Sequence, residues 1–280
     1  FSTHARLNRV LTDLFGAAFA HIPALGLSIP PDTWTLQVQA PPGGGPPQPG
    51  LLAEYYDFSA SYGWDAAHKV GEGTVLTSGS FNYGNNYAYG PWGDLEDSFG
   101  VRYTGYINIP VSGTYSFHMD SDDRSWIFID VDGDGTLEAA PGNDNWHVWW
   151  DVDLAAGLHA VEFRSREFGG GESSRLEWLM PGSTSWQWIP AQYFVQNLYD
   201  GAWMAMLYGT GQIGDILNEG LFHRFPFDPD TEYTLRLTVD FFGDHLVIGP
   251  ETFVFIPEPT TCLLLGGGLL MLVRRRRRRK

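Results

Sequence analysis

The sequence predicts an all-β protein built from antiparallel strands, and three observations support this prediction. Aromatic residues make up 15% of the 280 residues, and there are 34 glycines. This composition is typical of short strands joined by tight turns. Apolar and polar residues alternate in most segments between Leu51 and Val195, which is the pattern of strands with one buried face. Turn residues recur between these segments at the spacing of a β-sandwich or barrel.

The N-terminal segment, residues 1–40, combines a helical pattern with a strand pattern. One stripe of a predicted helix carries Leu7, Val10, Leu11, Leu14, Phe15 and Ala18. A strand is predicted by the alternation of Trp34, Leu36, Val38 and Ala40. We expect the helical stripe to face a core rather than a membrane. Because the chain starts at Phe1, we interpret the segment as a truncated or processed N-terminal unit.

The run "PPGGGPPQPG" at residues 41–50 predicts a linker, because proline and glycine disfavour both helices and strands. The domain expected after it covers residues 51–195. Alternation predicts that its core contains Tyr115, Phe117, Trp126, Phe128, Phe163 and Trp178. The segment "SWIFID" is apolar on both faces, so both of its sides are expected to be buried.

Trp149 falls on the opposite face of its predicted strand from Trp146 and Trp150. An exposed Trp149 ring could stack on a sugar, whereas a strand buried on both sides would place the ring in the core. We favour burial and keep Trp149 as a candidate carbohydrate-binding residue.

Residues 196–255 form a further β-rich region, in which "TEYTLRLTVDFF" has a clear alternation. This region forms either a small unit of its own or strands added to the first domain.

The charge distribution excludes some classes of partner. The formal net charge is -16, although seven of the 17 basic residues occupy the last seven positions. The remainder of the chain is therefore strongly acidic and would be repelled by nucleic acid. The single cysteine, Cys262, excludes an intrachain disulfide.

Two acidic loops are candidate cation sites. "DSDDRS" contains Asp122 and Asp123. "DVDGDGTLE" places Asp130, Asp132, Asp134 and Glu138 around glycines. Oxygen ligands in such an arrangement suit Ca²⁺, and the alternative for the second loop is a solvated acidic turn. An EF-hand is rejected because Pro141 occupies the position of its bidentate glutamate.

No catalytic motif is found, so we do not expect an enzyme. The string "GTGQIG" is followed too soon by Gly220 to open the helix of a dinucleotide site. The histidines are scattered along the chain without metal-ligand pairs, so zinc is not expected. A glycosidase needs only two carboxylates, and no such pair stands out.

The region Leu51–Val195 resembles a PA14 domain. The similarity lies in "GLLAEYYDF", "VRYTGYINIPVSGTYSFHMDSDDRSWIFID", "LAAGLHAVEFRSRE" and "WIPAQYF". The resemblance implies a barrel-like β-sandwich found in extracellular adhesins, toxins and glycosidases, many of which bind carbohydrate. In the yeast adhesin branch, two adjacent aspartates joined by a cis peptide hold a Ca²⁺ that contacts sugar hydroxyls. Asp122 and Asp123 match that pair. Arg102-Tyr103 in place of Arg-Trp, and the acidic insertion 130–138, depart from the family pattern.

The C-terminal segment, residues 256–280, resembles a PEP-CTERM sorting signal. The motif Pro257-Glu258-Pro259 precedes a 14-residue apolar stretch, "TTCLLLGGGLLMLV", for which we expect a helix. A basic block that includes Arg274, Arg275 and Arg276 follows it. The apolar stretch is shorter than the ~20 residues of a full membrane span. The resemblance implies an exported bacterial protein that is anchored transiently in the inner membrane and processed by an exosortase.

Together these features predict an exported protein of the cell surface or extracellular matrix that binds a glycan or exopolysaccharide. Its candidate cofactor is Ca²⁺. The predicted binding residues are Asp122, Asp123 and Trp149. The alternatives are a structural matrix or spacer protein without a defined ligand and an accessory module of a hydrolase.

Overall fold

The computed structural model describes residues 33–40, 44–81, 97–170, 173–209, 232–241 and 244–254. Throughout these ranges the chain forms strands and short 3-10 turns, and it contains no α-helix. The predicted all-β class is therefore confirmed. The predicted N-terminal helix, the C-terminal apolar helix and the sorting motif lie outside the described residues.

The strands follow one another along the chain with two 3-10 turns between them. In order they are β1 (Thr33–Gln39), β2 (Leu51–Asp57), β3 (Lys69–Val75), η1 (Ser78–Phe81), β4 (Phe99–Ile109), β5 (Gly113–Ile129), β6 (Glu138–Ala139), β7 (Asn145–Leu154), β8 (Gly157–Glu167), β9 (Ser173–Leu179), β10 (Gln187–Trp188), η3 (Ala191–Tyr193), β11 (Phe194–Val195), β12 (Trp203–Gly209), β13 (Glu232–Phe241) and β14 (Asp244–Val254).

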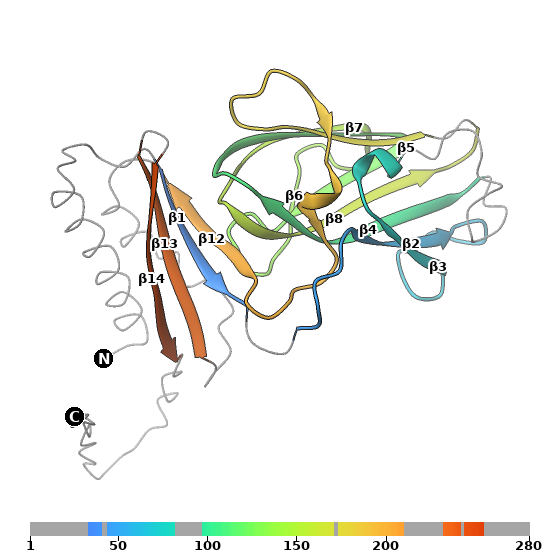
Figure 1. Ribbon diagram of the computed structural model, residues 1–280. Helices are drawn as coiled ribbons and strands as arrows, with labels where there is room; N and C mark the ends of the chain where they lie inside the picture. The colour runs from blue at the N-terminus through green and yellow to red at the C-terminus, as the bar shows by residue number, and fades with distance from the viewer. Residues whose placement is uncertain are drawn as a thin grey trace, which may run out of the picture.

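Strand β5 joins the two layers of the sandwich (Figure 1). Its first part pairs with β7 on one side and with β9 on the other, and β10 extends this layer beyond β9. Its last part, from Arg124 to Ile129, pairs with β8 in the second layer, which continues through β4 and β2 to β3. The change of layer occurs at Asp122 and Asp123, whose peptide bond is cis.

The core between the layers contains most of the side chains predicted to be inside. Tyr115, Phe117, Phe163 and Trp178 are fully buried, and Trp126 is also buried. Phe128 is an exception: it is only half-buried, and the Arg164 guanidinium lies 5.1 Å from the centre of its ring. The prediction that both faces of "SWIFID" are buried was therefore wrong at Phe128, because this side chain points away from the core that holds Ile127 and Ile129.

Trp149 is 55% exposed, so the burial that we favoured for this residue was wrong. The reason is that the face of β7 opposite the core faces solvent, since His147, Asp151 and Asp153 on that face are exposed as well. One face of β7 packs Val148, Val152 and Leu154 into the core, while the other face is open to solvent. Trp146 is also exposed, although its position in the alternation predicted the core face. It lies where the β5–β7 register shifts.

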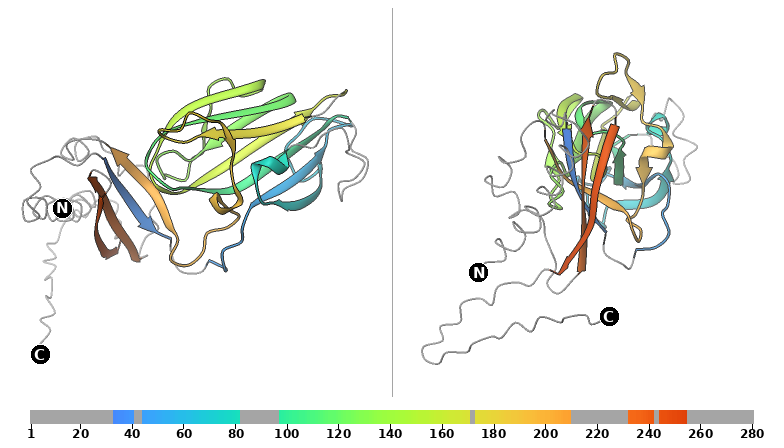
Figure 2. Two further views of the ribbon diagram at one scale, coloured as in Figure 1. Left: turned by 45° about the horizontal axis from the view of Figure 1, so that its top comes forward. Right: turned by 60° about the vertical axis from the view of Figure 1, so that its left-hand side comes forward.

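Strands β1, β12, β13 and β14 form an antiparallel group to one side of the sandwich (Figures 1 and 2). β1 pairs with both β12 and β13, so a strand from the N-terminal segment lies between strands from the β-rich region. Met204 of β12 pairs in parallel with Leu158 of β8, which connects the group to the sandwich.

The described part of the predicted linker is fastened to the segment that follows η3. The Gly44 amide donates to the Asp200 carboxylate over 2.9 Å, and the Gln48 amide donates to Asn197 Oδ1 over 3.0 Å. The described part of this segment thus forms no helix or long strand, but hydrogen bonds still hold its backbone in place.

Candidate functional site

Three groups of side chains bring potential metal-ligand atoms within 4.8 Å of one another in the described part of the chain. Two are carboxylate groups that involve sequence-predicted residues, and the third combines two histidines with an aspartate. The groups are Asp122, Asp123 and Glu167; Asp130, Asp132 and Glu138; and His118, Asp120 and His147.

The first group lies at the corner where β5 changes layer. Asp122 and Asp123 form the cis pair, and Glu167, which is 2% exposed, ends β8. The Phe168 amide donates to Asp123 Oδ2 over 2.8 Å. Burial raises the pKa of Asp122, and the hydrogen bond and charge of Asp123 raise that pKa further. Three carboxylates at this spacing repel one another unless a proton or a cation lies between them.

Basic residues near this corner are engaged elsewhere. Arg124 points its Nε toward Asp144 Oδ1 at 3.5 Å and donates from Nη1 to the backbone carbonyl of Asp123. Within the described ranges, neither the Asp122 nor the Asp123 side chain forms an ion pair with a basic group. The charge of these two aspartates is therefore not offset by a direct ion pair among the described residues.

Exposed aromatic rings border the same corner. The Arg166 guanidinium lies 3.9 Å from the ring centre of Tyr62 and 4.3 Å from that of Phe168. Tyr62 and Phe168 both expose much of their surface. Because the Phe168 amide also binds Asp123, one residue connects the aromatic rings to the carboxylates.

The second group lies in the loop between β5 and β6. Asp130 is 2% exposed, and its Oδ2 accepts the Gly135 amide over 3.1 Å. Burial raises the pKa of Asp130 to about 6. Glu138 Oε2 accepts the Val131 amide over 2.8 Å. Asp134, which the sequence predicted as a ligand, is not one of the three grouped residues, and its Oδ1 accepts the Thr136 amide instead.

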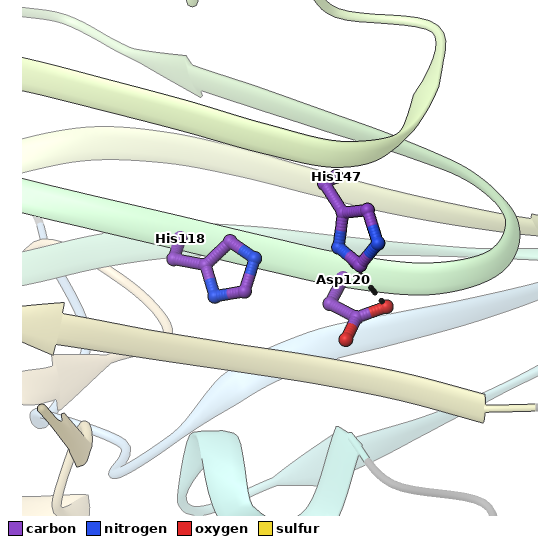
Figure 3. A group of neighbouring side chains, drawn as sticks. All are labelled: His118, Asp120 and His147. Carbon is purple, nitrogen blue, oxygen red and sulfur yellow. Dashed lines mark ion pairs between the residues drawn. The ribbon is translucent and has the colours of Figure 1, made fainter.

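The third group lies on the outer face of the β7–β5–β9 layer (Figure 3). His118 and Asp120 are two residues apart on β5, and His147 is the β7 partner of Asp120. His147 Nδ1 lies 3.6 Å from Asp120 Oδ1. Arg175 of β9 donates to the other oxygen of Asp120 over 3.2 Å. Histidines that looked scattered in the sequence are thus brought together by strand pairing.

His118 is 5% exposed and is covered by Trp149, whose ring stacks on it at 3.5 Å between centres and 9° between planes. Burial lowers the pKa of His118 to about 4, so the imidazole is neutral at pH 7. Trp186 meets Trp149 edge-on at 5.4 Å. We call Trp149, Trp186 and His118 the aromatic patch. No sequence pattern pointed to Trp186, because it lies in the loop directly before β10, outside any periodic segment.

A cavity of about 550 Å³ lies between the sandwich and the strands β1, β12 and β13. Its lining includes Gln37, Ser112, Trp203 and Arg236. The Arg236 guanidinium lies 4.1 Å from the Trp203 ring centre and donates to Gln37 over 2.6 Å. None of the predicted site residues lines this cavity.

The structure thus divides the predicted residues among separate places. Asp122 and Asp123 meet Glu167, Asp130 and Asp132 meet Glu138, and Trp149 belongs to the aromatic patch. The tail residues, Pro257 to Pro259 and Arg274 to Arg276, lie outside the described residues. In the described ranges, no helix has the length and apolar character needed to span a membrane.

Comparison with known proteins adds a family match. The family model described as "PA14 domain" matches residues 48–150. No curated protein matches the chain. Among solved structures, the Epithelial Adhesin 6 A domain from Candida glabrata, in complex with Galb1-3GlcNAc, is 16% identical with a TM-score of 0.44, and the match covers 60% of this chain and 96% of that one. The PA14 domain of the antifreeze protein MpAFP is 17% identical with a TM-score of 0.42, and the match covers 56% of this chain and 96% of that domain. A PA14 sugar-binding domain from an RTX adhesin is 18% identical with a TM-score of 0.40, and the match covers 53% of this chain and 98% of that domain.

Proposed function

We propose that the chain, whose residues 48–150 match the PA14 domain family model, binds carbohydrate at the Asp122–Asp123 corner with the help of Ca²⁺. The observation that carries the proposal is the meeting of Asp122, Asp123 and Glu167 within 4.8 Å at a corner bordered by exposed aromatic rings. The resemblance to the adhesin branch implies the same role for an adjacent aspartate pair.

The donor atoms of this corner favour Ca²⁺ over other ions. Ca²⁺ takes six to eight oxygen ligands, and all three side chains offer carboxylate oxygens. Zinc prefers nitrogen and sulfur, which this group lacks. Three carboxylates do not complete the coordination of Ca²⁺, so positions remain for water or for two hydroxyls of a sugar.

The neighbouring side chains supply the apolar part of a sugar site. Sugar rings present C–H faces that stack on aromatic side chains. Phe168, whose amide binds Asp123, is partly exposed, and Tyr62 contacts the same Arg166 guanidinium as Phe168. Trp149 is a second candidate stacking surface, since it is exposed within the aromatic patch. We assign the principal sugar contact to the Asp122–Asp123 corner because its group offers three carboxylates, which suit Ca²⁺, whereas the group beside the aromatic patch offers two histidines and one aspartate.

We also propose that the protein is exported and functions at the cell surface or in the extracellular matrix. The support is the C-terminal sequence, in which Pro257-Glu258-Pro259, an apolar stretch and an arginine block follow one another. The partners in this proposal are an exosortase that acts on the tail, a transient inner-membrane anchorage and an extracellular glycan. The protein itself acts as a binding module rather than an enzyme.

A glycan array probed with and without Ca²⁺ tests the binding proposal. The wild-type protein is expected to bind a defined group of glycans in Ca²⁺ and to lose them in excess chelator. Asp122→Asn with Asp123→Asn keeps the side-chain shapes and removes two charges, so binding should fall at least tenfold. Asp151→Asn, an exposed acid on β7, is the matched control and should bind as wild type.

Two other results would redirect the assignment. Glycan binding that persists in chelator and in the double variant, but is lost in Trp149→Ala, would move the sugar site to the aromatic patch. An array with no bound glycan in either condition would favour the structural spacer or the accessory module of a hydrolase.

A further inference from the structure

The loop between β5 and β6 has a feature that carbohydrate binding does not explain. It starts at Asp130, immediately after β5, and ends at Glu138, which pairs with Ile129 across the hairpin. The two ends of the loop are therefore held side by side. Carboxylate oxygens of Asp130, Asp132 and Glu138 converge within 4.8 Å inside it.

The buried member of this group has an oxygen whose hydrogen-bonding capacity is unmet. Asp130 is 2% exposed, and its Oδ1 has no hydrogen-bond partner among the described residues. A carboxylate buried in this way normally requires a hydrogen-bond donor or a positive charge. In the described part of the chain, neither Asp130 nor Glu138 forms an ion pair with a lysine, arginine or histidine. The His159 ring contacts only the backbone carbonyl of Asp130 on this side.

Backbone amides hold each carboxylate by one oxygen. The Gly135 amide donates to Asp130 Oδ2, the Val131 amide to Glu138 Oε2, and the Asp134 amide to Asp132 Oδ1. These bonds fix the orientation of the three carboxylates while leaving the second oxygen of Asp130 unmatched. A cation placed among the carboxylates would satisfy that oxygen and cancel their mutual repulsion.

We infer that Asp130, Asp132 and Glu138 form a structural Ca²⁺ site that is separate from the proposed glycan site. All of the available side-chain ligands are oxygens, which suits Ca²⁺, and its irregular shell of six to eight ligands can be completed by loop carbonyls and water. Mg²⁺ fits less well because it demands a near-ideal octahedron and retains several waters.

The position of the loop makes its role structural. Asp123 and Asp130 lie at opposite ends of the stretch of β5 that pairs with β8. Seven residues of strand at ~3.3 Å each separate the two places by roughly 20 Å. A cation in the loop is therefore out of reach of a sugar bound at the Asp122–Asp123 corner. It would instead lock the β5–β6 hairpin, whose pairing spans only two residues of β6.

Calorimetric titration with CaCl₂ of the full chain, stripped by chelator, tests this inference without any glycan. In the Asp122→Asn, Asp123→Asn background, one Ca²⁺ should still bind and should raise the melting temperature. Adding Asp132→Asn and Glu138→Gln should weaken this remaining binding at least tenfold. Asp151→Asn together with Asp153→Asn removes the same number of charges from exposed positions of β7 and should have no effect.

Two further measurements test the inference if the variant with Asp132→Asn and Glu138→Gln does not fold. In the Asp122→Asn, Asp123→Asn background, Asp130→Asn keeps the volume of the side chain and can still accept the Gly135 amide. This protein should therefore fold and lose the remaining Ca²⁺ response. In the wild-type protein, Ca²⁺ should slow proteolytic cleavage between Asp130 and Glu138 relative to chelator. Mg²⁺ at the same concentration should protect less.

The inference is overturned if the Asp122→Asn, Asp123→Asn protein binds no Ca²⁺, or if the loop variants bind it with unchanged affinity. It is independent of glycan recognition. Loss of the loop site should leave the array pattern unchanged, whereas failure of the glycan proposal would leave calcium binding by the loop intact.

Discussion

At the scale of single residues, His118 illustrates how burial on one face of a sheet layer changes the pKa of a side chain. The imidazole lies under the Trp149 ring and faces Asp120, Arg175 and His147. Burial dominates and lowers the pKa of His118 to about 4, with Arg175 and His147 acting in the same direction and Asp120 opposing them. A buried neutral histidine of this kind makes stability depend on pH.

We predict that the free energy of unfolding falls as the pH drops from about 6.5 to about 4. The unfolded chain takes up a proton on His118 in this window while the folded protein does not, which favours unfolding by about 1–3 kcal/mol at the acid end. His118→Phe retains the stacked ring and should remove most of this dependence. Urea denaturation at pH 7 and pH 4.5 measures it. An equally steep loss in His118→Phe would assign the effect to other groups.

At the scale of elements, buried and exposed tryptophans of the strands should contribute very differently to the free energy of unfolding. Trp178 of β9 is fully buried against Tyr115 and Phe117, whereas Trp146 of β7 is exposed. Trp178→Ala should lower the free energy of unfolding by about 3–5 kcal/mol because it leaves a large cavity. Trp146→Ala should change it by less than about 1 kcal/mol. Similar losses for the two variants in chemical denaturation would contradict the burial of Trp178 and the exposure of Trp146.

Alternation along each strand was enough to predict much of the fold, since Tyr115, Phe117, Phe163 and Trp178 all face the core. It could not predict that the face of β7 carrying Trp149 is open to solvent, because alternation separates the two faces of a strand without showing what covers each of them. Trp149 was therefore assigned to the wrong environment. Glu167 could not be predicted because strand pairing is not visible in the sequence of a single strand. Only the β5–β8 pairing brings Glu167 close to an aspartate pair more than forty residues earlier in the chain.

The proximity of the side chains in the acidic loops could be predicted from the local sequence, whereas the proximity of the two histidines could not. The spacing of Asp130, Asp132 and Glu138 lies within one short loop, so their proximity follows from the chain itself. His118 and His147 meet only because β5 pairs with β7 in a register that opposes Asp120 to His147. Contacts that depend on strand register cannot be predicted from short sequence motifs, because the motif does not show which residues oppose one another.

At the scale of the whole molecule, the sandwich and the β1–β12–β13–β14 group share one continuous set of strand pairings. A segment near the start of the chain, β1, is held between strands that come much later. The proposed binding corner belongs to the sandwich.

Processing of the tail is a prediction about the whole chain in its native host. We expect mass spectrometry of secreted protein to detect no peptide from Leu263 to Val273. Replacing Pro257 and Glu258 by alanine should leave the tail attached and retain the protein in the membrane fraction. Glu251→Ala removes an acidic residue outside the motif and should be processed normally. Intact tail peptides in secreted wild-type protein would contradict the proposal.

The most direct test of the central claim is a crystal structure of the protein with Ca²⁺ and a glycan selected on the array. We predict an ion bound by the carboxylates of Asp122 and Asp123, with two sugar hydroxyls among its ligands and the sugar beside Phe168. A glycan bound at the aromatic patch or in the cavity near Arg236, with no ion at the aspartate pair, would contradict it.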